Sequence, residues 1–174
     1  MSSTHYGITK GNASMDILLH HLEERGISLS GSTVLDLACR DGTFTRHLSQ
    51  LCQSVIGVDA TTERIIERTP STPHTRYIRG LAEHLPCERN SFDYVFAWNC
   101  WGSFDRHKVL SEMDRVLKPS GRLIIMERQL PVQTTDAFPF HWYEEWKSAS
   151  FNLQHEWSCS TKPTEQLHVV ILKR

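Results

Sequence analysis

The chain has 174 residues, 39% of them hydrophobic, which suits one globular domain with a core of its own. A net charge of −1 and a pI near 6.8 leave no basic footprint for nucleic acid or an acidic membrane surface. Five cysteines without a C-x-x-C pair predict free thiols in a reducing compartment, and no apolar run reaches the ~20 residues of a membrane span. We therefore expect a soluble, cytoplasmic protein.

The first element is a helix that follows a polar N-terminus. Residues 1–14 are small and polar and are expected to form a flexible lead-in to a single domain over residues 15–174. The helix is predicted to begin at Asn12 or Ser14, whose side chains suit an N-cap, and to stop at Gly26. Its apolar residues share one face, which is the pattern of a helix packed on a core.

The next stretch reads as strand, turn and helix. The apolar run at residues 33–37 is too short for a helix and suits a buried parallel strand that carries Asp36 near its end. Gly42 allows a tight turn, and residues 43–52 then show helical spacing. A strand that turns directly into a helix leaves free N–H groups beside the turn, so a ligand site is expected there.

Strands and helices alternate along the rest of the chain, which predicts an α/β fold with a mostly parallel sheet. The predicted strands cover residues 54–59, 75–79, 90–98, 122–127, 152–160 and 165–173, and the predicted helices cover 62–68, 106–117 and 141–150.

Two stretches resemble motifs of class I S-adenosylmethionine (SAM)-dependent methyltransferases. Residues 36–42, Asp-Leu-Ala-Cys-Arg-Asp-Gly, are similar to the first motif of that family, an acidic residue followed by a Gly-x-Gly-x-Gly turn. Residues 115–121, Arg-Val-Leu-Lys-Pro-Ser-Gly, resemble the family's Arg-Val-Leu-Lys-Pro-Gly-Gly. The resemblance covers about residues 15–174 and points to the small-molecule, type 11-like domain. It implies a Rossmann-like, seven-stranded, mostly parallel sheet with helices on both faces and an antiparallel last strand.

The resemblance also implies SAM as cofactor, S-adenosylhomocysteine as product, and a helix near the N-terminus that covers the cofactor or only packs on the core. Asp59 ends the second predicted strand, 23 residues after Asp36, where a carboxylate accepts both ribose hydroxyls. The compatible alternative is that the Asp59 side chain is the N-cap of a helix from Thr61 onward. The implied cofactor-binding residues are Asp36, Ala38, Cys39, Arg40, Gly42, Asp59, Ala60, Ala82, Glu83 and Trp98.

Three positions depart from the family pattern. Ala38 and Arg40 stand where the first and second glycines of the turn are usual. We expect Arg40 to occupy backbone space that glycine prefers, with its side chain either a tolerated departure or a ligand contact. Leu81 stands where relatives carry an aspartate that holds the adenine amino group, so that contact is absent.

The expected activity is methyl transfer from SAM to a small or medium organic acceptor by in-line displacement. This reaction needs alignment and a dry cavity, and a base only if the acceptor loses a proton. The candidate bases are His84, His107, Glu127 and His141, and no catalytic residue is assigned. His84 and Cys87 lack a second pair, so no metal site is predicted.

Aromatic residues concentrate in two loops that we expect to face the acceptor. Trp101 and Trp142 are predicted to hold a planar organic molecule, whereas core packing is the alternative for part of this group. The group comprises Trp98, Trp101, Phe104, Phe138, Phe140, Trp142, Tyr143 and Trp146.

Two other functions stay open. One is a methyltransferase-fold protein that binds SAM or a partner without transferring methyl groups, and the other is an NAD-dependent enzyme. A protein partner or a homodimer is compatible with the sequence, and nucleic acid is not favoured.

Overall fold

The computed structural model describes residues 13–61, 72–129, 146, 149, 151–162 and 165–174. Its helices are α1 (Ala13–Glu24), α2 (Thr43–Leu48) and α4 (Arg106–Val116), with a short 3₁₀ helix η1 (Trp101–Ser103). Its strands are β1 (Thr33–Leu37), β2 (Ser54–Asp59), β3 (Thr75–Arg79), β4 (Phe92–Trp98), β5 (Leu117–Gln129), β6 (Asn152–Lys162) and β7 (Glu165–Lys173).

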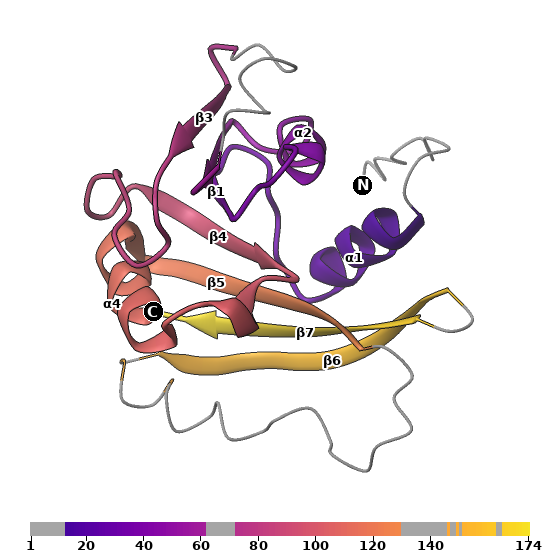
Figure 1. Cartoon of the computed structure of the whole chain (residues 1–174). Coiled ribbons are helices and arrows are strands. Elements are labelled where there is room, and N and C mark those ends of the chain that lie inside the picture. The colour runs from indigo at the N-terminus through magenta and orange to yellow at the C-terminus, as the bar shows by residue number, and fades with distance from the viewer. Residues whose placement is uncertain (1–12, 62–71, 130–145, 147–148, 150, 163–164) are drawn as a thin grey trace.

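The strands form one seven-stranded sheet in the order β3-β2-β1-β4-β5-β7-β6 (Figure 1). Neighbours from β3 to β5 pair in parallel, and β7 lies antiparallel to both β5 and β6. The predicted sheet and its antiparallel last strand are therefore confirmed. Strand β7 inserts between β5 and β6, so the last strand of the chain is not the edge of the sheet.

The chain runs outward from β1 through β2 to β3 and then returns to place β4 on the other side of β1. Successive connections therefore leave β1 and β4 in opposite directions. In open α/β sheets such a switch point opens a crevice at the carboxyl ends of the strands, where ligands bind. The ends of β1 and β4 are thus the place where a site is expected.

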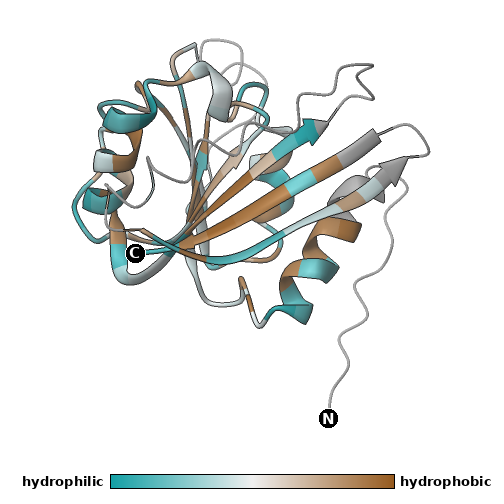
Figure 2. Cartoon of the chain, turned by 90° about the horizontal axis from the view of Figure 1, so that it is seen from below, coloured by the Kyte–Doolittle hydropathy of each residue, from teal (hydrophilic) through white to brown (hydrophobic). Residues whose placement is uncertain are grey.

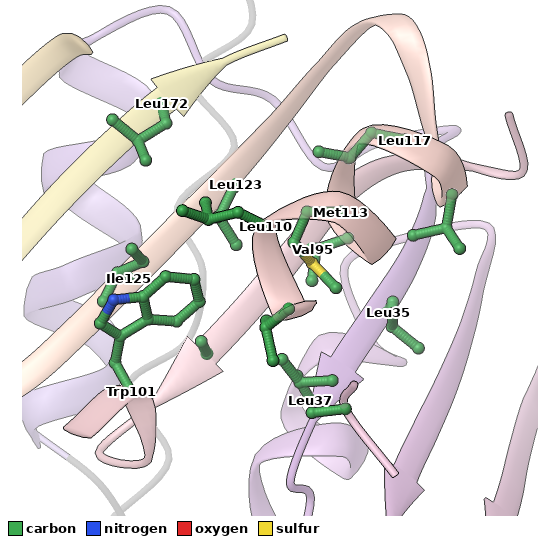
Figure 3. Close-up of a cluster of buried hydrophobic side chains, with 14 of the residues drawn as sticks. Leu35, Leu37, Val95, Trp101, Leu110, Met113, Leu117, Leu123, Ile125 and Leu172 are labelled. Atoms are coloured by element: carbon green, nitrogen blue, oxygen red, sulfur yellow. The ribbon is translucent and has the colours of Figure 1, made fainter. Parts of the chain in front are cut away.

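Helices cover both faces of the sheet, and alternate residues of each strand point to one or the other. In β4, Val95 and Ala97 pack in the cluster that contains the buried face of α4, part of which Figure 3 shows. Tyr94 and Phe96 pack in the second cluster, with the buried faces of α1 and α2. The central strands are apolar on both faces, whereas the edge strand β6 is largely polar (Figure 2). Burial on both faces is the usual state of a parallel sheet.

Two element boundaries differ by four residues or more from those predicted. Helix α2 ends at Leu48 rather than at residue 52. Strand β5 begins at Leu117, because residues 118–121 form an irregularity within it, between the pairs Phe92–Leu117 and Tyr94–Arg122. At Gly121 an added Cβ would lie 2.9 Å from the Leu117 side chain, which explains a glycine in this bend.

Some predicted elements lie outside the described residues. These are the lead-in up to residue 12, the helix over 62–68, and all of the helix over 141–150 except Trp146 and Ala149. None of the helices in the described part of the chain is long and apolar enough to cross a membrane.

Candidate functional site

The predicted cofactor residues come together at the carboxyl edge of the sheet. Residues 38–42 follow β1, residues 59–61 end β2, residues 81–84 follow β3, and residues 98–101 follow β4. Parallel strands all end at one edge, so four loops far apart in sequence become neighbours. Each loop lies beside the switch point between β1 and β4 or on its β2–β3 side.

The turn after β1 has a backbone that favours glycine. Ala38 has φ 56°, Arg40 has φ 51° and Gly42 has φ 70°. The prediction that Arg40 occupies glycine-like backbone space is confirmed. Asn99, at the end of β4, has φ 49°, so three of the four described non-glycine residues with positive φ lie at this edge. Each such residue costs on the order of 1–3 kcal/mol, and strain of this kind concentrates at functional sites.

Asp59 joins the end of β2 to this turn. Its Oδ2 accepts a hydrogen bond from the Arg40 N–H (2.9 Å). Its Oδ1 accepts from the Thr61 N–H (2.8 Å) and from Thr61 Oγ1 (2.9 Å), whereas the helix that it would cap lies outside the described residues. A carboxylate offers about four acceptor positions, so Asp59 keeps acceptor capacity beyond these three donors. The ribose role stays a prediction.

Asp36 and Cys39 support the turn from within the protein. Thr45 Oγ1 donates to Asp36 Oδ2 over 2.5 Å, and the Asp36 carboxyl is 1% exposed. Burial raises the pKa of Asp36 to about 7, and the nearby charges of Asp59 and Asp41 add to the rise. Burial likewise raises the pKa of the Cys39 thiol, which therefore stays protonated and unreactive.

The ring of Tyr77 of β3 occupies the space that a side chain at Gly42 or Gly57 would need. A Cβ on Gly42 would lie 2.8 Å from Cε1 of the Tyr77 ring, and a Cβ on Gly57 would lie 3.0 Å from its Cδ1. The ring therefore packs directly against the glycine backbone of the turn and of β2. The sequence carried no signal for this contact, because the three residues come from separate elements.

Arg40 and Glu127 connect the turn with the ends of β4 and β5. The Arg40 guanidinium donates to the Asn99 carbonyl oxygen (3.2 Å), and the Asn99 N–H donates to the Met126 carbonyl oxygen (2.7 Å). Glu127 Oε1 accepts the Trp101 N–H (2.7 Å), so this carboxylate holds η1 at the end of β5. Burial raises the pKa of Glu127, while the backbone N–H groups of Trp101 and Cys100 and the charge of Arg40 oppose the rise.

An ion pair on α4 holds the loop that follows β3. Glu112 Oε2 accepts the Leu85 N–H (2.7 Å), and the Arg115 guanidinium donates to the carbonyl oxygens of Leu85 (3.0 Å) and Cys87 (2.6 Å). Arg115 also pairs with Glu112 over 2.7 Å. Arg115 is the first residue of the stretch 115–121 that resembles a family motif. Its bonds to Leu85 and Cys87 hold the loop after β3. The loop carries Leu81, which is 58% exposed and places no carboxylate at the site.

The prediction that Trp101 holds an acceptor as part of an exposed aromatic floor is wrong. Trp101 is fully buried and lies against the sheet beside Ile125 (Figure 3). Its main chain is held by Glu127, and η1 turns the ring back into the core. Trp146 is also buried in this cluster, so the core alternative applies to both rings.

The remaining candidates have different environments. Trp98 is half-buried, with its ring centroid 4.9 Å from that of Phe44. His84 and His107 are exposed on the surface. Among the described residues no group of three His, Cys, Asp or Glu side chains could hold a metal ion. The other predicted members, which lie outside the described residues, are Phe138, Phe140, His141, Trp142 and Tyr143.

Comparison with known proteins places this geometry in a family. A family profile described as a methyltransferase domain matches residues 35–125. A phthiotriol/phenolphthiotriol dimycocerosates methyltransferase of Mycobacterium ulcerans is 31% identical, over 76% of this chain and 47% of the relative. A demethylmenaquinone methyltransferase of Staphylococcus aureus is 35% identical, over 58% of this chain and 45% of the relative. The chain thus spans about half the length of these relatives.

Solved structures show the same fold at lower sequence identity. A SAM-dependent methyltransferase from Mesorhizobium loti superimposes with a TM-score of 0.73 and 15% identity, over 94% of this chain and 99% of that one. Its likeness concerns the fold, and the profile match over residues 35–125 carries the assignment. The chain therefore belongs to the family of methyltransferase domains, with the fold of the class I SAM-dependent methyltransferases.

Proposed function

We propose that this protein transfers a methyl group from SAM to a small or medium organic acceptor. The observation that carries the proposal is the pairing of Asp59 with the glycine-like turn after β1 at the switch point of the sheet. A carboxylate there can accept ribose hydroxyls, and a turn in this conformation lets a ligand approach the main chain closely.

The chain's residues fit this cofactor. Asp59 keeps about one free acceptor position for a ribose hydroxyl, and a second becomes available if the Thr61 hydroxyl turns away. The turn of residues 38–42 presents main-chain groups beside it. Ala82, after β3, is buried in the core, so its main chain is the part that could meet an adenine ring. SAM, when bound, supplies a methyl group already activated by a sulfonium. Cys39 and Asp36 support the turn and are not free to react.

The residues of the site act by alignment. Asp59 and the turn orient the cofactor, and Glu127 sets the position of the loop after β4 through the Trp101 N–H. No base is assigned, because Glu127 is occupied by the main chain of η1 and the exposed histidines lie on loop and helix surfaces.

The acceptor class follows from charge and from the named relatives. The chain has a net charge of −1, which does not favour a nucleic-acid strand as substrate. The relatives' names identify a lipid and a quinone precursor as their acceptors. We therefore propose an organic molecule of small to medium size as the acceptor.

A second candidate function has its own observation. The Arg40 guanidinium crosses from the turn to Asn99, and Leu81 offers no carboxylate for an adenine amino group. Both features are compatible with a methyltransferase-fold protein that binds SAM without transferring its methyl group.

Calorimetric titration with SAM, S-adenosylhomocysteine and NAD tests the cofactor. We expect binding of the first two and none of NAD, and the reverse result would contradict the proposal. Formation of S-adenosylhomocysteine is then measured with a panel of phenols, quinols and lipid alcohols. Tight SAM binding with no turnover on any class would favour the second candidate.

A further inference from the structure

Arg40 is the departure from the family pattern that brings a charged side chain to the site. Its backbone is fixed, because the Arg40 N–H donates to Asp59 Oδ2 (2.9 Å). Its side chain is exposed and reaches across the switch point to the Asn99 carbonyl oxygen (3.2 Å). A cation therefore stands between the ends of β1 and β4, over the crevice where a ligand is expected.

The order of the sheet decides which part of the cofactor arrives there. The loop after β3 carries the proposed adenine contacts, Asp59 at the end of β2 the proposed ribose contact, and the turn of residues 38–42 follows β1. SAM is a linear molecule in which adenine, ribose, sulfonium and amino acid follow one another. With its first two parts over β3 and β2, its amino-acid end must extend over β1 toward β4, to the guanidinium.

The chemistry of the guanidinium fits a carboxylate better than its present partner. Arginine has five N–H donors in a planar fork that matches a carboxylate with two parallel bonds. Among the described residues, Arg40 makes one long side-chain hydrogen bond, to the neutral Asn99 carbonyl. Exchange of that carbonyl for an anion would strengthen the contact without moving the main chain.

Backbone strain supports the same conclusion. Arg40 and Asn99 both have positive φ, 51° and 49°, and they are hydrogen-bonded to each other across the crevice. Glycine would adopt such a conformation at no steric cost, whereas arginine pays for it. The strain of an arginine at this position is therefore expected to be offset by an interaction of its charged side chain that glycine cannot make.

We propose that Arg40 binds the α-carboxylate of the methionine part of SAM, a role that the family's second glycine cannot fill. The inference rests on the proposed function, since it requires that SAM binds at this edge.

Two ligands that differ only in the carboxylate test it: SAM and decarboxylated SAM. Their dissociation constants are measured by calorimetry for wild type, Arg40→Ala and Arg40→Gly, with folding checked by thermal melting. Arg122→Ala is the control, because this arginine pairs with Gln154 on β6 and its loss changes net charge equally. Loss of a charge-assisted pair predicts about ten- to hundredfold weaker SAM binding in both Arg40 variants, with decarboxylated SAM within twofold of wild type.

The other outcomes overturn the proposal. Equal weakening of both ligands would mean that Arg40 only shapes the turn. Unchanged or tighter SAM binding in Arg40→Gly would mean that the side chain is a tolerated departure. If wild type binds neither SAM nor decarboxylated SAM, the proposed function itself fails. If wild type binds SAM and the Arg40 variants show either result above, only the Arg40 assignment fails.

Discussion

At the scale of single residues, the site depends on carboxylates that differ in burial and in partners. Asp59 is 9% exposed and accepts three protein donors, whereas Asp36 is 1% exposed and accepts one hydroxyl. A carboxylate with spare acceptor positions at a ligand edge suits recognition, and a desolvated one beneath a turn suits support. The two acidic residues of the first two strands therefore have separate tasks.

Asp59→Ala is expected to weaken SAM binding at least tenfold. Two hydrogen bonds to a charged acceptor are worth about 1.5–3 kcal/mol each, and the substitution also frees the Arg40 N–H of the turn. The matched control is Thr61→Val, which removes the hydroxyl that donates to Asp59 Oδ1 but keeps the carboxylate. Calorimetry should find the SAM affinity of the control within a few-fold of wild type. Unchanged SAM affinity in a folded Asp59→Ala protein would contradict the ribose assignment.

The buried Asp36 is expected to give the protein a pH-dependent stability. Its pKa rises from 3.8 to about 7 on folding, so between these values the folded state holds a proton that the unfolded chain has released. Stability therefore falls as pH rises through this window and levels off above about pH 7. Asn cannot ionise and can still accept from Thr45, so Asp36→Asn should lack this slope.

Urea unfolding of both proteins between about pH 5 and 7.5 measures the difference. The free energy of unfolding of wild type should fall relative to Asp36→Asn by about 2–3 kcal/mol over that range. Parallel stability curves for the two proteins would show that the Asp36 carboxyl titrates as in the unfolded chain.

At the scale of elements, helix α4 does more than cover one face of the sheet. Its buried side packs on the core, and its ion pair between Glu112 and Arg115 holds the loop of residues 80–87 by three main-chain contacts. Near the start of the same helix, the Asp105 N–H donates to Glu83 Oε1 (3.2 Å). The helix and its N-cap therefore hold the middle and the end of the loop that carries the proposed adenine contacts.

Arg115→Met is expected to weaken binding of SAM and of adenosine by a similar factor, roughly tenfold or about 1.4 kcal/mol. Arg174→Met is the matched control, because Arg174 also bonds α4 and main chain, at Asp114 and Leu117, but away from this loop. Both variants should lose stability by about 1–3 kcal/mol, since each removes several hydrogen bonds. Equal ligand affinity in the two variants would show that the contacts of Glu112 and Arg115 with the loop of residues 80–87 serve stability alone.

At the scale of the whole molecule, two cores separated by the sheet determine which aromatic side chains remain available for ligands. The larger one encloses Trp101 between the sheet and the α4 side (Figure 3). The indole N–H of Trp101 has no hydrogen-bond partner among the described residues. Its contribution there is therefore apolar packing, and not recognition of an acceptor.

Trp101→Ala is expected to lower the free energy of unfolding by about 3–5 kcal/mol, the usual cost of removing a large buried ring. Trp101→Phe should cost less, because it keeps most of the volume and removes an N–H without a described partner. Denaturant midpoints measure both effects. A Trp101→Ala protein of wild-type stability with reduced turnover would restore the acceptor role that the structure argues against.

The sequence by itself determined the architecture and the edge of the sheet at which the candidate residues lie. Short apolar runs alternating with helical patterns define a parallel sheet, and a run that ends in Asp36 or Asp59 places a carboxylate at its edge. Local spacing carries this information, because a strand's faces alternate along a few neighbouring residues. The glycine-like backbone of Arg40 also followed from its place in a motif.

Only the tertiary structure decided what the side chains at that edge touch. The Arg40–Asn99 bond joins residues 59 apart in sequence, and the Arg115–Leu85 bond joins residues 30 apart. The burial of Trp101 likewise depends on Glu127, 26 residues later, which holds its main chain while η1 turns the ring inward. Such contacts arise when separate loops meet at the end of a sheet. No pattern along the chain records which side chain will face the ligand and which will close the core.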